Sequence, residues 1–334
     1  MKAAVLEQNG LIEDAPLRLA DLAIPEPGKG EVRVKVRCCA VCRTDLHVVE
    51  GELPAQRLPI IPGHQAVGVV DALGPGCACL QAGQRVGVAW LRRTCGECAA
   101  CRHGRENLCE ASEYTGYHAN GGFAEYLTVP ETFAYCLPDV FEDVEVAPLL
   151  CGGIIGYRAL SRCNVPDGGR LALYGFGSSA HIVLQIAKHR GFQVYVVTRG
   201  ETRQELARRL GADWAGATAG EMPDKADSAI IFAPAGELVP PALEMLAPGG
   251  TLALAGIYMT DVPRLEYEKH LFHEREVRSV AANTREDGRR LFEEAAEVPV
   301  KTHTSTYPLS DANRALQDLK AGRVKGTGVL VMGA

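Results

Sequence analysis

Four cysteines lie within one short stretch of the chain, TCGECAACRHGRENLCE. Cys95, Cys98, Cys101 and Cys109 follow the spacing C-x2-C-x2-C-x7-C, and such short steps let consecutive sulfurs point at one tetrahedral centre. Iron–sulfur proteins also use C-x2-C-x2-C, but here no Pro follows the fourth cysteine and the intervening residues are charged. The spacing therefore favours a zinc ion with four thiolate ligands. Such an ion has no open position, so it stabilises a loop and performs no chemistry.

Metal-dependent catalysis would then need a second, open site. Cys42 and His64 lie far apart in sequence, each at the end of a β-rich run and close to Gly or Pro, and Cys151 follows where the sequence pattern changes. Two thiolates and one neutral imidazole cancel the charge of Zn²⁺ and leave a fourth position for water or substrate. Spacing alone makes this trio a weak candidate, because a single His or Cys is more often a core residue than a ligand.

A glycine-rich turn in RLALYGFGSSAHIVLQIA points to a coenzyme. It reads Gly175-x-Gly177-x-x-Ala180 between a predicted strand and a predicted helix. The two glycines permit a tight turn and the close approach of a pyrophosphate to the helix N-terminus, and Ala at the third position still allows helix–strand packing. The pattern is weak by itself, but its position inside a strand–helix–strand unit predicts dinucleotide binding.

The end of the next predicted strand, VVTRGETR, bears on which dinucleotide is bound. Sites for NAD place Asp or Glu there, on the ribose 2′-OH, whereas this chain has Thr198 followed by Arg199 and Arg203. An uncharged residue backed by guanidinium groups tolerates a 2′-phosphate. The sequence therefore favours NADP over NAD, and the alternative is that both arginines are simply exposed charges at a helix start.

Two kinds of supporting structure are predicted for these residues. The first half alternates short β-rich runs with Gly and Pro, which predicts a small β-barrel or sandwich with little helix. From about residue 152 strands alternate with helices, which is typical of a doubly wound parallel sheet. The tail after about residue 283 contains an amphipathic helix and then a strand, a helix and a final strand, and it is compatible with a return to the first domain.

Composition limits the remaining function classes. A chain of 334 residues suggests two domains, and a formal charge of −6 provides no basic field for nucleic acid or an anionic membrane. No stretch approaches the roughly 20 apolar residues of a spanning helix, and the start lacks a signal-peptide core, so we expect a cytoplasmic protein. In that compartment the 12 cysteines are expected to stay reduced, and the six without ligand spacing are expected to be buried apolar residues.

Several of these motifs occur together, in order, in a known family. The chain resembles the zinc-dependent medium-chain alcohol dehydrogenases in Cys42-Arg43-Thr44-Asp45-x-His47, Gly63-His64, the four-cysteine loop, Cys151-Gly152 and the glycine-rich turn. The resemblance covers essentially the whole chain. It implies a GroES-like β-barrel catalytic domain, residues 1–152 completed by 286–334, and a Rossmann coenzyme domain, residues 153–285, with an active-site cleft between the two.

The resemblance also implies metal roles, carried over residue by residue. Cys42, His64 and Cys151 match the ligands of a catalytic zinc, and the four loop cysteines match those of a structural zinc, so about two zinc ions per chain are expected. Asp45 matches a group that would fix the tautomer and orientation of His64.

A proton path is implied in the same way. Thr44 matches the hydroxyl that hydrogen-bonds the substrate oxygen, His47 matches the outer end of a proton relay, and Arg43 matches a pyrophosphate contact. The relay suits these types, because a hydroxyl can pass a proton outward and an imidazole titrates near neutral pH. Trp90 and Leu91 occupy positions that line the substrate pocket in family members, and a large indole there suggests a primary or small secondary alcohol.

Two positions depart from the family pattern. Gln65 stands directly after the ligand His, where the family usually has Glu, so a negative charge behind the metal is missing. Ile155 stands where a Thr near the nicotinamide carboxamide is common, so one hydroxyl is missing. We therefore expect Gln65 to affect turnover.

Together these observations predict an alcohol dehydrogenase or aldehyde reductase that transfers hydride reversibly between a small-molecule alcohol and NAD(P). One alternative is a polyol dehydrogenase, in which the third thiolate is often a carboxylate. Another is a non-catalytic coenzyme-binding protein on the same fold, in which the zinc ligands are typically missing. Family members of this size imply a homodimer or homotetramer, with no nucleic-acid or membrane partner.

Overall fold

The computed structural model describes residues 1–298 and 300–333. The chain divides into two compact units, each with its own buried apolar cluster. The first unit comprises Met1–Cys151, Ala282–Phe292 and Lys301–Ala334, and the second comprises Gly152–Ala281 and Glu293–Val300. No single helix of the described residues is long and apolar enough to cross a membrane, although the bent pair Asp143–Leu150 and Gly152–Ser161 passes by length and composition when taken together.

A seven-stranded, mostly antiparallel sheet is the framework of the first unit. Its path runs β16-β17-β3-β4-β5-β9, and β8 also pairs with β3. The strands are β3 (Glu31–Ala40), β4 (Ala66–Leu73), β5 (Arg85–Val88), β8 (Tyr126–Pro130), β9 (Ala134–Cys136), β16 (Thr304–Pro308) and β17 (Thr327–Val331). Along β3, Val32, Val34 and Val36 are buried at alternate positions, because successive side chains of a strand point to opposite faces.

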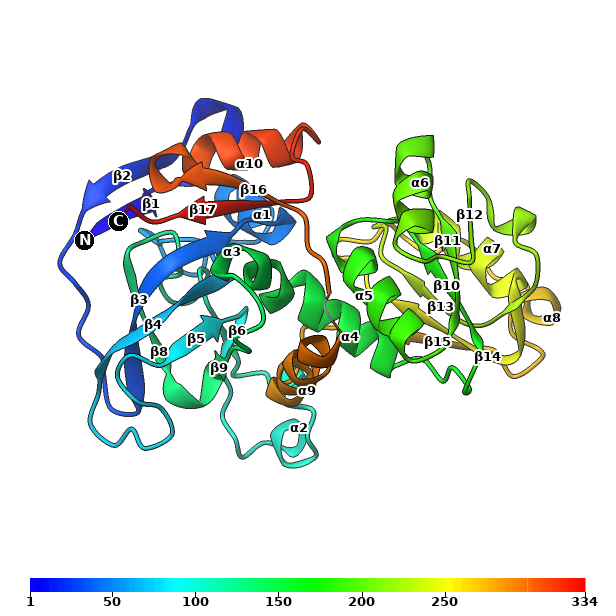
Figure 1. The fold of residues 1–334 in the computed structure, drawn as a ribbon, viewed down its shortest axis with the longest axis horizontal. Coiled ribbons are helices and arrows are strands. Elements are labelled where there is room, and N and C mark those ends of the chain that lie inside the picture. Colours follow the sequence, from blue (N-terminus) through cyan, green and yellow to red (C-terminus); the bar gives the residue numbers. More distant parts are fainter. Residues whose placement is uncertain (299, 334) are drawn as a thin grey trace. The chain divides into compact units, whose positions relative to one another are not determined.

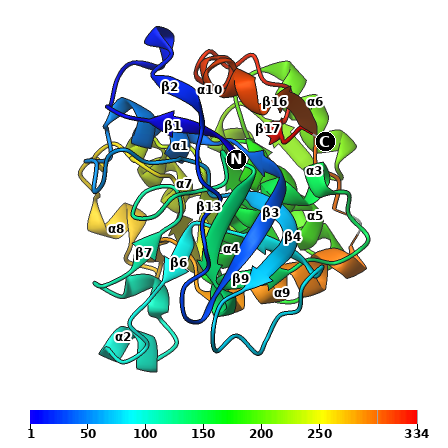
Figure 2. The ribbon, with the colours of Figure 1, turned by 90° about the vertical axis from the view of Figure 1, so that its left-hand side faces the viewer.

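The C-terminal tail is part of this first unit. β17 runs antiparallel to β3, with Leu330 opposite Cys39, and in Figure 1 the red final strand lies beside the blue β3. α10 (Ala312–Lys320) lies near the strands β1 (Lys2–Leu6) and β2 (Leu17–Asp21) in both Figure 1 and Figure 2. The side-chain amide of Gln317 on α10 donates to the carbonyl oxygen of Ile12 at 2.9 Å, which fixes the last helix against the first residues of the chain.

Short elements complete the first unit. They are α1 (Arg43–Glu50), β6 (Leu91–Arg93), α2 (Ala99–Arg102), β7 (Glu113–Tyr114) and α3 (Asp143–Val146). Of these, α1 is a two-turn helix whose N-cap is the candidate ligand Cys42, so the β-rich half contains a helix directly after that residue.

The second unit is built on a six-stranded parallel sheet with the order β12-β11-β10-β13-β14-β15. Its strands are β10 (Arg170–Tyr174), β11 (Gln193–Val197), β12 (Trp214–Gly216), β13 (Ala226–Ile231), β14 (Leu246–Leu254) and β15 (Glu276–Ser279). Its helices are α4 (Gly152–Ser161), α5 (Ser178–His189), α6 (Glu201–Arg209), α7 (Val239–Glu244) and α8 (Tyr267–His270). α9 (Arg285–Glu297) begins in the first unit and ends in the second.

This strand order is that of a Rossmann sheet, 3-2-1-4-5-6, with the reversal between β10 and β13. α5 and α7 lie on opposite sides of the strands (Figure 1), as expected when the crossovers on either side of the reversal are both right-handed. The predicted α/β fold class is therefore confirmed. The edge strands β12 and β15 were not predicted, because runs of three and four residues carry too little periodicity.

Candidate metal centre and coenzyme site

Three soft ligand atoms converge in the first unit. Cys42 Sγ lies 3.4 Å from His64 Nε2 and 3.9 Å from Cys151 Sγ, and all three ligand atoms lie within 4.8 Å of one another. Cys42 follows β3 and is the N-cap of α1, and Cys151 ends a short 3-10 turn. Gly63, with φ of +96°, lets the chain present His64, and a Cβ at Gly63 would lie 2.4 Å from the Phe123 ring.

These distances suit a zinc ion. Bonds of about 2.3 Å to sulfur and 2.05 Å to nitrogen at tetrahedral angles give edges of about 3.6 Å for S···N and about 3.8 Å for S···S. The adjacent Cys151 sulfur and burial raise the pKa of the Cys42 thiol well above its ordinary value. Two thiolates at this separation would need a cation, and the three protein ligand atoms that converge among the described residues are one fewer than a tetrahedral zinc ion takes.

Asp45 makes hydrogen bonds to two of these three residues. One oxygen of its buried carboxylate lies 3.0 Å from His64 Nδ1, and the other accepts the backbone N–H of Cys42 at 2.9 Å. With Nδ1 hydrogen-bonded to the carboxylate, Nε2 is the nitrogen left to bind a metal at the point where the three ligand atoms converge. Asp45 thus orients two of the three candidate ligands at once.

Helix α1 carries the other residues expected to serve the reaction. Thr44 is buried, and its backbone N–H donates to Cys42 Sγ at 3.3 Å, whereas Arg43 at the first helical position is exposed. His47 lies one turn further on, and its Nδ1 contacts the carboxylate of Glu52. Sequence reasoning missed Glu52, although the glycine before it signals that the chain turns back after the helix.

Trp90 is the predicted pocket residue that adjoins the metal cluster. Its ring centroid lies 5.0 Å from that of His64, edge to face, and Tyr114 stacks on it at 4.9 Å. Tyr114 was not singled out by sequence, because nothing local distinguishes it. Leu91, in contrast, is 1 % exposed and belongs to the apolar core. Gln65 is also buried, and its side-chain amide donates to the carbonyl oxygen of Ala40 at 3.3 Å.

The four loop cysteines form a second cluster. Cys95 Sγ lies 3.9 Å from Cys101 Sγ and 3.6 Å from Cys109 Sγ, and the four sulfurs lie within 4.8 Å of one another. Backbone N–H groups donate to these sulfurs, from Cys98 to Cys95 at 3.3 Å and from Cys101 to Cys98 at 3.5 Å. The donor set is complete for a tetrahedral four-thiolate ion.

Local hydrogen bonds prepare part of this set for a metal. Backbone N–H groups of Glu97 and Cys98 lower the pKa of the Cys95 thiol to about 6, whereas burial raises that of Cys101 to about 11. Metal ligation requires the deprotonated form, so binding of a metal would release protons here. Of the other cysteines, Cys38 and Cys39 are buried as expected, but Cys79 and Cys136 are exposed, which corrects the prediction that all six are core residues.

In the second unit, the glycine-rich turn joins β10 to α5. Gly175 has φ of +86°, and a Cβ there would lie 3.1 Å from the backbone nitrogen of Ala233, which follows β13 at the reversal of strand order. Nothing lies within 4 Å of a Cβ position on Gly177, the N-cap of α5, and Ala180 is fully buried. The turn thus leaves an open helix N-terminus, which suits a pyrophosphate.

The residues expected at the adenosine ribose follow β11. Thr198 is 5 % exposed, and its carbonyl oxygen accepts the side-chain amide of Gln204 at 2.9 Å. Arg199 and Arg203 are exposed on either side of Gly200, which precedes α6. No carboxylate occupies the Thr198 position, so a 2′-phosphate meets no like charge from this residue.

Comparisons with known proteins agree with this architecture. Residues 28–139 match the family model of the alcohol dehydrogenase GroES-like domain, and residues 180–297 match that of the zinc-binding dehydrogenases. The probable alcohol dehydrogenase AdhA of Mycobacterium tuberculosis is 50 % identical over 337 residues, covering 99 % of this chain and 97 % of the relative. An alcohol dehydrogenase of Geobacillus stearothermophilus is 34 % identical, with 99 % of each chain covered.

A solved structure supports the same assignment. The cobalt- and zinc-bound thermostable alcohol dehydrogenase of Pyrobaculum aerophilum has a TM-score of 0.88 and 27 % identity, with 99 % of each chain covered. Sequence identity along the whole chain and the shared fold agree with the ligand clusters above. The chain therefore belongs to the zinc-dependent medium-chain alcohol dehydrogenase family.

Proposed function

We propose that the protein is a zinc-dependent alcohol dehydrogenase that transfers hydride reversibly between a primary or small secondary alcohol and NAD(P). The observation that carries this proposal is the convergence of Cys42, His64 and Cys151, with Asp45 holding the imidazole. Three protein ligands with one open position are the arrangement of catalytic rather than structural zinc sites. The oxidoreductase activity of the named relatives supports it.

Different residues at this site contribute to the removal of the alcohol proton in this proposal. A zinc ion held by Cys42, His64 and Cys151 would supply Lewis acidity to the alcohol oxygen. The Thr44 hydroxyl accepts the hydrogen bond of that alcohol and passes its proton outward. His47 then takes up the proton and exchanges it with solvent, as an imidazole does readily near neutral pH. Trp90 lines the substrate side and limits the size of the alcohol.

The coenzyme belongs to the second unit in this proposal. The pyrophosphate would be held at the N-terminus of α5 by Gly175, Gly177 and Ala180, with Arg43 as a further contact. Thr198, Arg199 and Arg203 favour NADP over NAD, because guanidinium groups attract the 2′-phosphate and no carboxylate repels it. Ile155 leaves the nicotinamide carboxamide without one common hydroxyl partner.

The remaining proposals concern the whole chain. The catalytic domain is residues 1–152 completed by 286–334, and the coenzyme domain is residues 153–285. About two zinc ions bind per chain, one catalytic and one structural in the four-cysteine loop. We further propose that the protein is cytoplasmic, because the free thiols suit a reducing compartment. A homodimer or homotetramer is proposed from the family resemblance.

One assay tests the reaction and the coenzyme together. Purified protein is given a panel of alcohols with NADP⁺ or NAD⁺, and reduced coenzyme is followed by absorbance. We expect oxidation of small alcohols with a higher kcat/KM for NADP⁺, and a large preference for NAD⁺ would reject the coenzyme assignment. Cys42→Ser should lower kcat about a thousandfold, because the metal supplies several kcal/mol to the transition state.

Cys79→Ser is the matched control for this assay, since Cys79 is an exposed cysteine outside both clusters. It should leave kcat unchanged. Wild-type turnover in Cys42→Ser protein that still contains zinc would contradict the assigned site.

A further inference from the structure

Glu106 binds the first residue of a distant helix. It lies between the third and fourth loop cysteines, in the 3-10 turn Glu106–Leu108, and is 8 % exposed. Its carboxylate accepts Arg285 Nε at 3.0 Å and Nη2 at 2.6 Å, and it also accepts the backbone N–H of Arg285 at 2.7 Å. One carboxylate thus neutralises a guanidinium and satisfies an N–H at the positive end of α9.

A second set of hydrogen bonds caps the N-terminus of α9 beside this contact. Thr284 and Asp287 form a reciprocal pair, in which the Thr284 N–H donates to Asp287 Oδ2 at 2.7 Å and the Asp287 N–H donates to Thr284 Oγ1 at 3.2 Å. The Arg285 guanidinium lies 4.5 Å above the ring of Phe133. Removing the Glu106 carboxylate would take a partner from both the guanidinium and the backbone N–H of Arg285, which is costly in a partly buried position.

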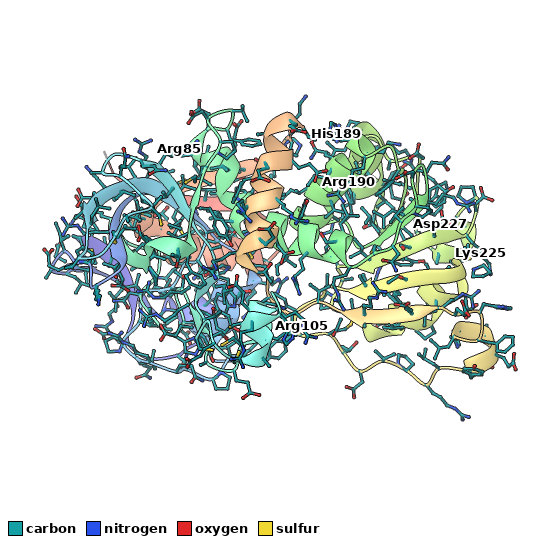
Figure 3. All side chains as sticks on the ribbon, turned by 90° about the horizontal axis from the view of Figure 1, so that it is seen from below. Arg85, Arg105, His189, Arg190, Lys225 and Asp227 are labelled. Carbon is teal, nitrogen blue, oxygen red and sulfur yellow. The ribbon has the colours of Figure 1, made fainter. Side chains whose placement is uncertain are left out.

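The other end of α9 has a similar ion pair within the second unit. Glu294 accepts Arg190 Nε at 2.8 Å and Nη2 at 2.7 Å. Arg190 is the C-cap of α5, next to His189 in Figure 3, and its guanidinium lies 5.2 Å above the Tyr157 ring. The N-terminus of the same α5 is the glycine-rich turn at Gly177.

These contacts form an unbroken series from the four-cysteine loop to the coenzyme turn. Residues 285–292 of α9 belong to the first unit and residues 293–297 to the second, within one continuous helix. The loop reaches the start of α9 through Glu106, and the end of α9 holds α5 through Arg190. Neither ion pair contains a candidate zinc ligand or a residue of the proposed proton path, so the proposed reaction does not explain them.

We propose that Glu106 and Arg285 are positioning residues that couple metal occupancy of the four-cysteine loop to coenzyme affinity. In this proposal the first turn of α9 has two states. It is ordered when a metal holds the four-cysteine loop and Glu106 binds Arg285, and it frays when the loop no longer holds Glu106 in place. A frayed start loosens the hold of α9 on α5 and hence on the pyrophosphate turn. This inference rests on the proposed coenzyme binding.

The first experiment measures coenzyme affinity in Glu106→Gln protein loaded with zinc. The NADPH dissociation constant should rise about tenfold, which is within the usual range for coupling between two sites. Coenzyme fluorescence measures it. Arg285→Lys keeps the charge without the paired hydrogen bonds and should give an intermediate value. Hydrogen exchange in the first turn of α9 should quicken in both variants, which confirms that the intended contact was removed.

Asp143→Asn is the matched control. Asp143 accepts Arg85 Nε at 2.7 Å and Arg37 Nη1 at 3.2 Å, so the variant removes carboxylate–guanidinium pairs elsewhere in the first unit; 23 % of the Asp143 side chain is exposed, against 10 % for Glu106, and Arg85 is labelled in Figure 3. It should lower the melting temperature to a similar extent. The NADPH dissociation constant should stay within about twofold of the wild-type value, which is the deviation expected between distant sites that are not coupled. Equal effects of Asp143→Asn and Glu106→Gln on affinity would overturn the inference.

A second experiment uses the reciprocity of coupling. In a Cys42→Ser background, where the loop is the remaining intact ligand set, saturating NADPH should slow zinc release to a chromophoric chelator, and Glu106→Gln should abolish that effect. Glu106→Gln and Arg190→Gln should also be non-additive in NADPH affinity. Additive effects, or wild-type affinity in Glu106→Gln, would reject this inference alone. Wild-type protein that binds neither coenzyme would reject the proposed function as well.

Discussion

At the scale of single residues, Cys42 has two roles that depend on each other. Its sulfur accepts the Thr44 N–H at the start of α1, and its own N–H donates to Asp45, so helix formation and ligand placement use the same atoms. The adjacent Cys151 sulfur and burial nevertheless raise the pKa of the Cys42 thiol. Local backbone geometry therefore places the ligand atom, and a bound cation would be needed to keep it deprotonated.

A substitution of Gln65 tests how a negative charge close to the candidate metal site affects turnover. Gln65→Glu should keep the zinc content but lower kcat, because an added carboxylate makes the metal less electrophilic. The buried side chain also loses its donor to the Ala40 carbonyl, at a cost of about 1–3 kcal/mol in the free energy of unfolding. Zinc analysis and kcat across pH are the measurements. Gln81→Glu, at an exposed position, is the control, and identical pH–rate profiles for Gln65→Glu and wild type would exclude a role.

At the scale of elements, the ion pair between Arg190 and Glu294 joins α5 to α9, and its strength depends on pH. Burial raises the pKa of Glu294, but the hydrogen bonds and positive charge of Arg190, together with smaller contributions from Tyr157 and His189, hold the pKa below its ordinary value of 4.5. A carboxyl whose pKa is lower in the folded state stabilises the fold above the unfolded-state pKa, and this contribution is lost as pH falls through the folded-state pKa.

The corresponding prediction concerns Glu294→Gln. Near neutral pH it should lower the free energy of unfolding by about 1.5 kcal/mol, the value of a hydrogen bond to a charged group. The difference from wild type should shrink as pH falls below about 4.5, because protonated Glu294 no longer forms the pair. Urea unfolding at several pH values measures this, and a difference that stays constant down to acidic pH would contradict it.

At the scale of the whole molecule, the two metal clusters should serve different purposes. Cys98→Ser removes a ligand of the four-cysteine loop, so it should lower bound zinc by about one ion per chain and the melting temperature by about 5 °C or more. Cys42→Ser should lower zinc by a similar amount with a smaller thermal effect, because Asp45 still caps α1. Metal analysis and calorimetry distinguish the two, and equal thermal losses would contradict separate structural and catalytic roles.

Local sequence was sufficient wherever the chemistry lies within one segment. The four loop cysteines and the Gly175–Gly177 turn are recognisable because their ligands or backbone groups are neighbours in the chain, where spacing alone restricts geometry. A β-rich run bounded by turn signals likewise predicted β3, the regular succession of strands and helices predicted β10, and helical apolar spacing predicted α5 and α9. The short strands β12 and β15 were missed, since their existence depends on pairing with longer neighbours.

Tertiary structure decided the contacts between distant segments. Cys42 and Cys151 are 109 residues apart, and Glu106 and Arg285 are 179 apart, so nothing in local periodicity states that they meet. Such contacts form only when burial of the sheet and its apolar core offsets the entropy of closing long loops. The sequence by itself determined the ligand types, the coenzyme turn and the fold class. The fold alone decided which carboxylate meets which cation, because that choice depends on how packed elements are placed and not on their order.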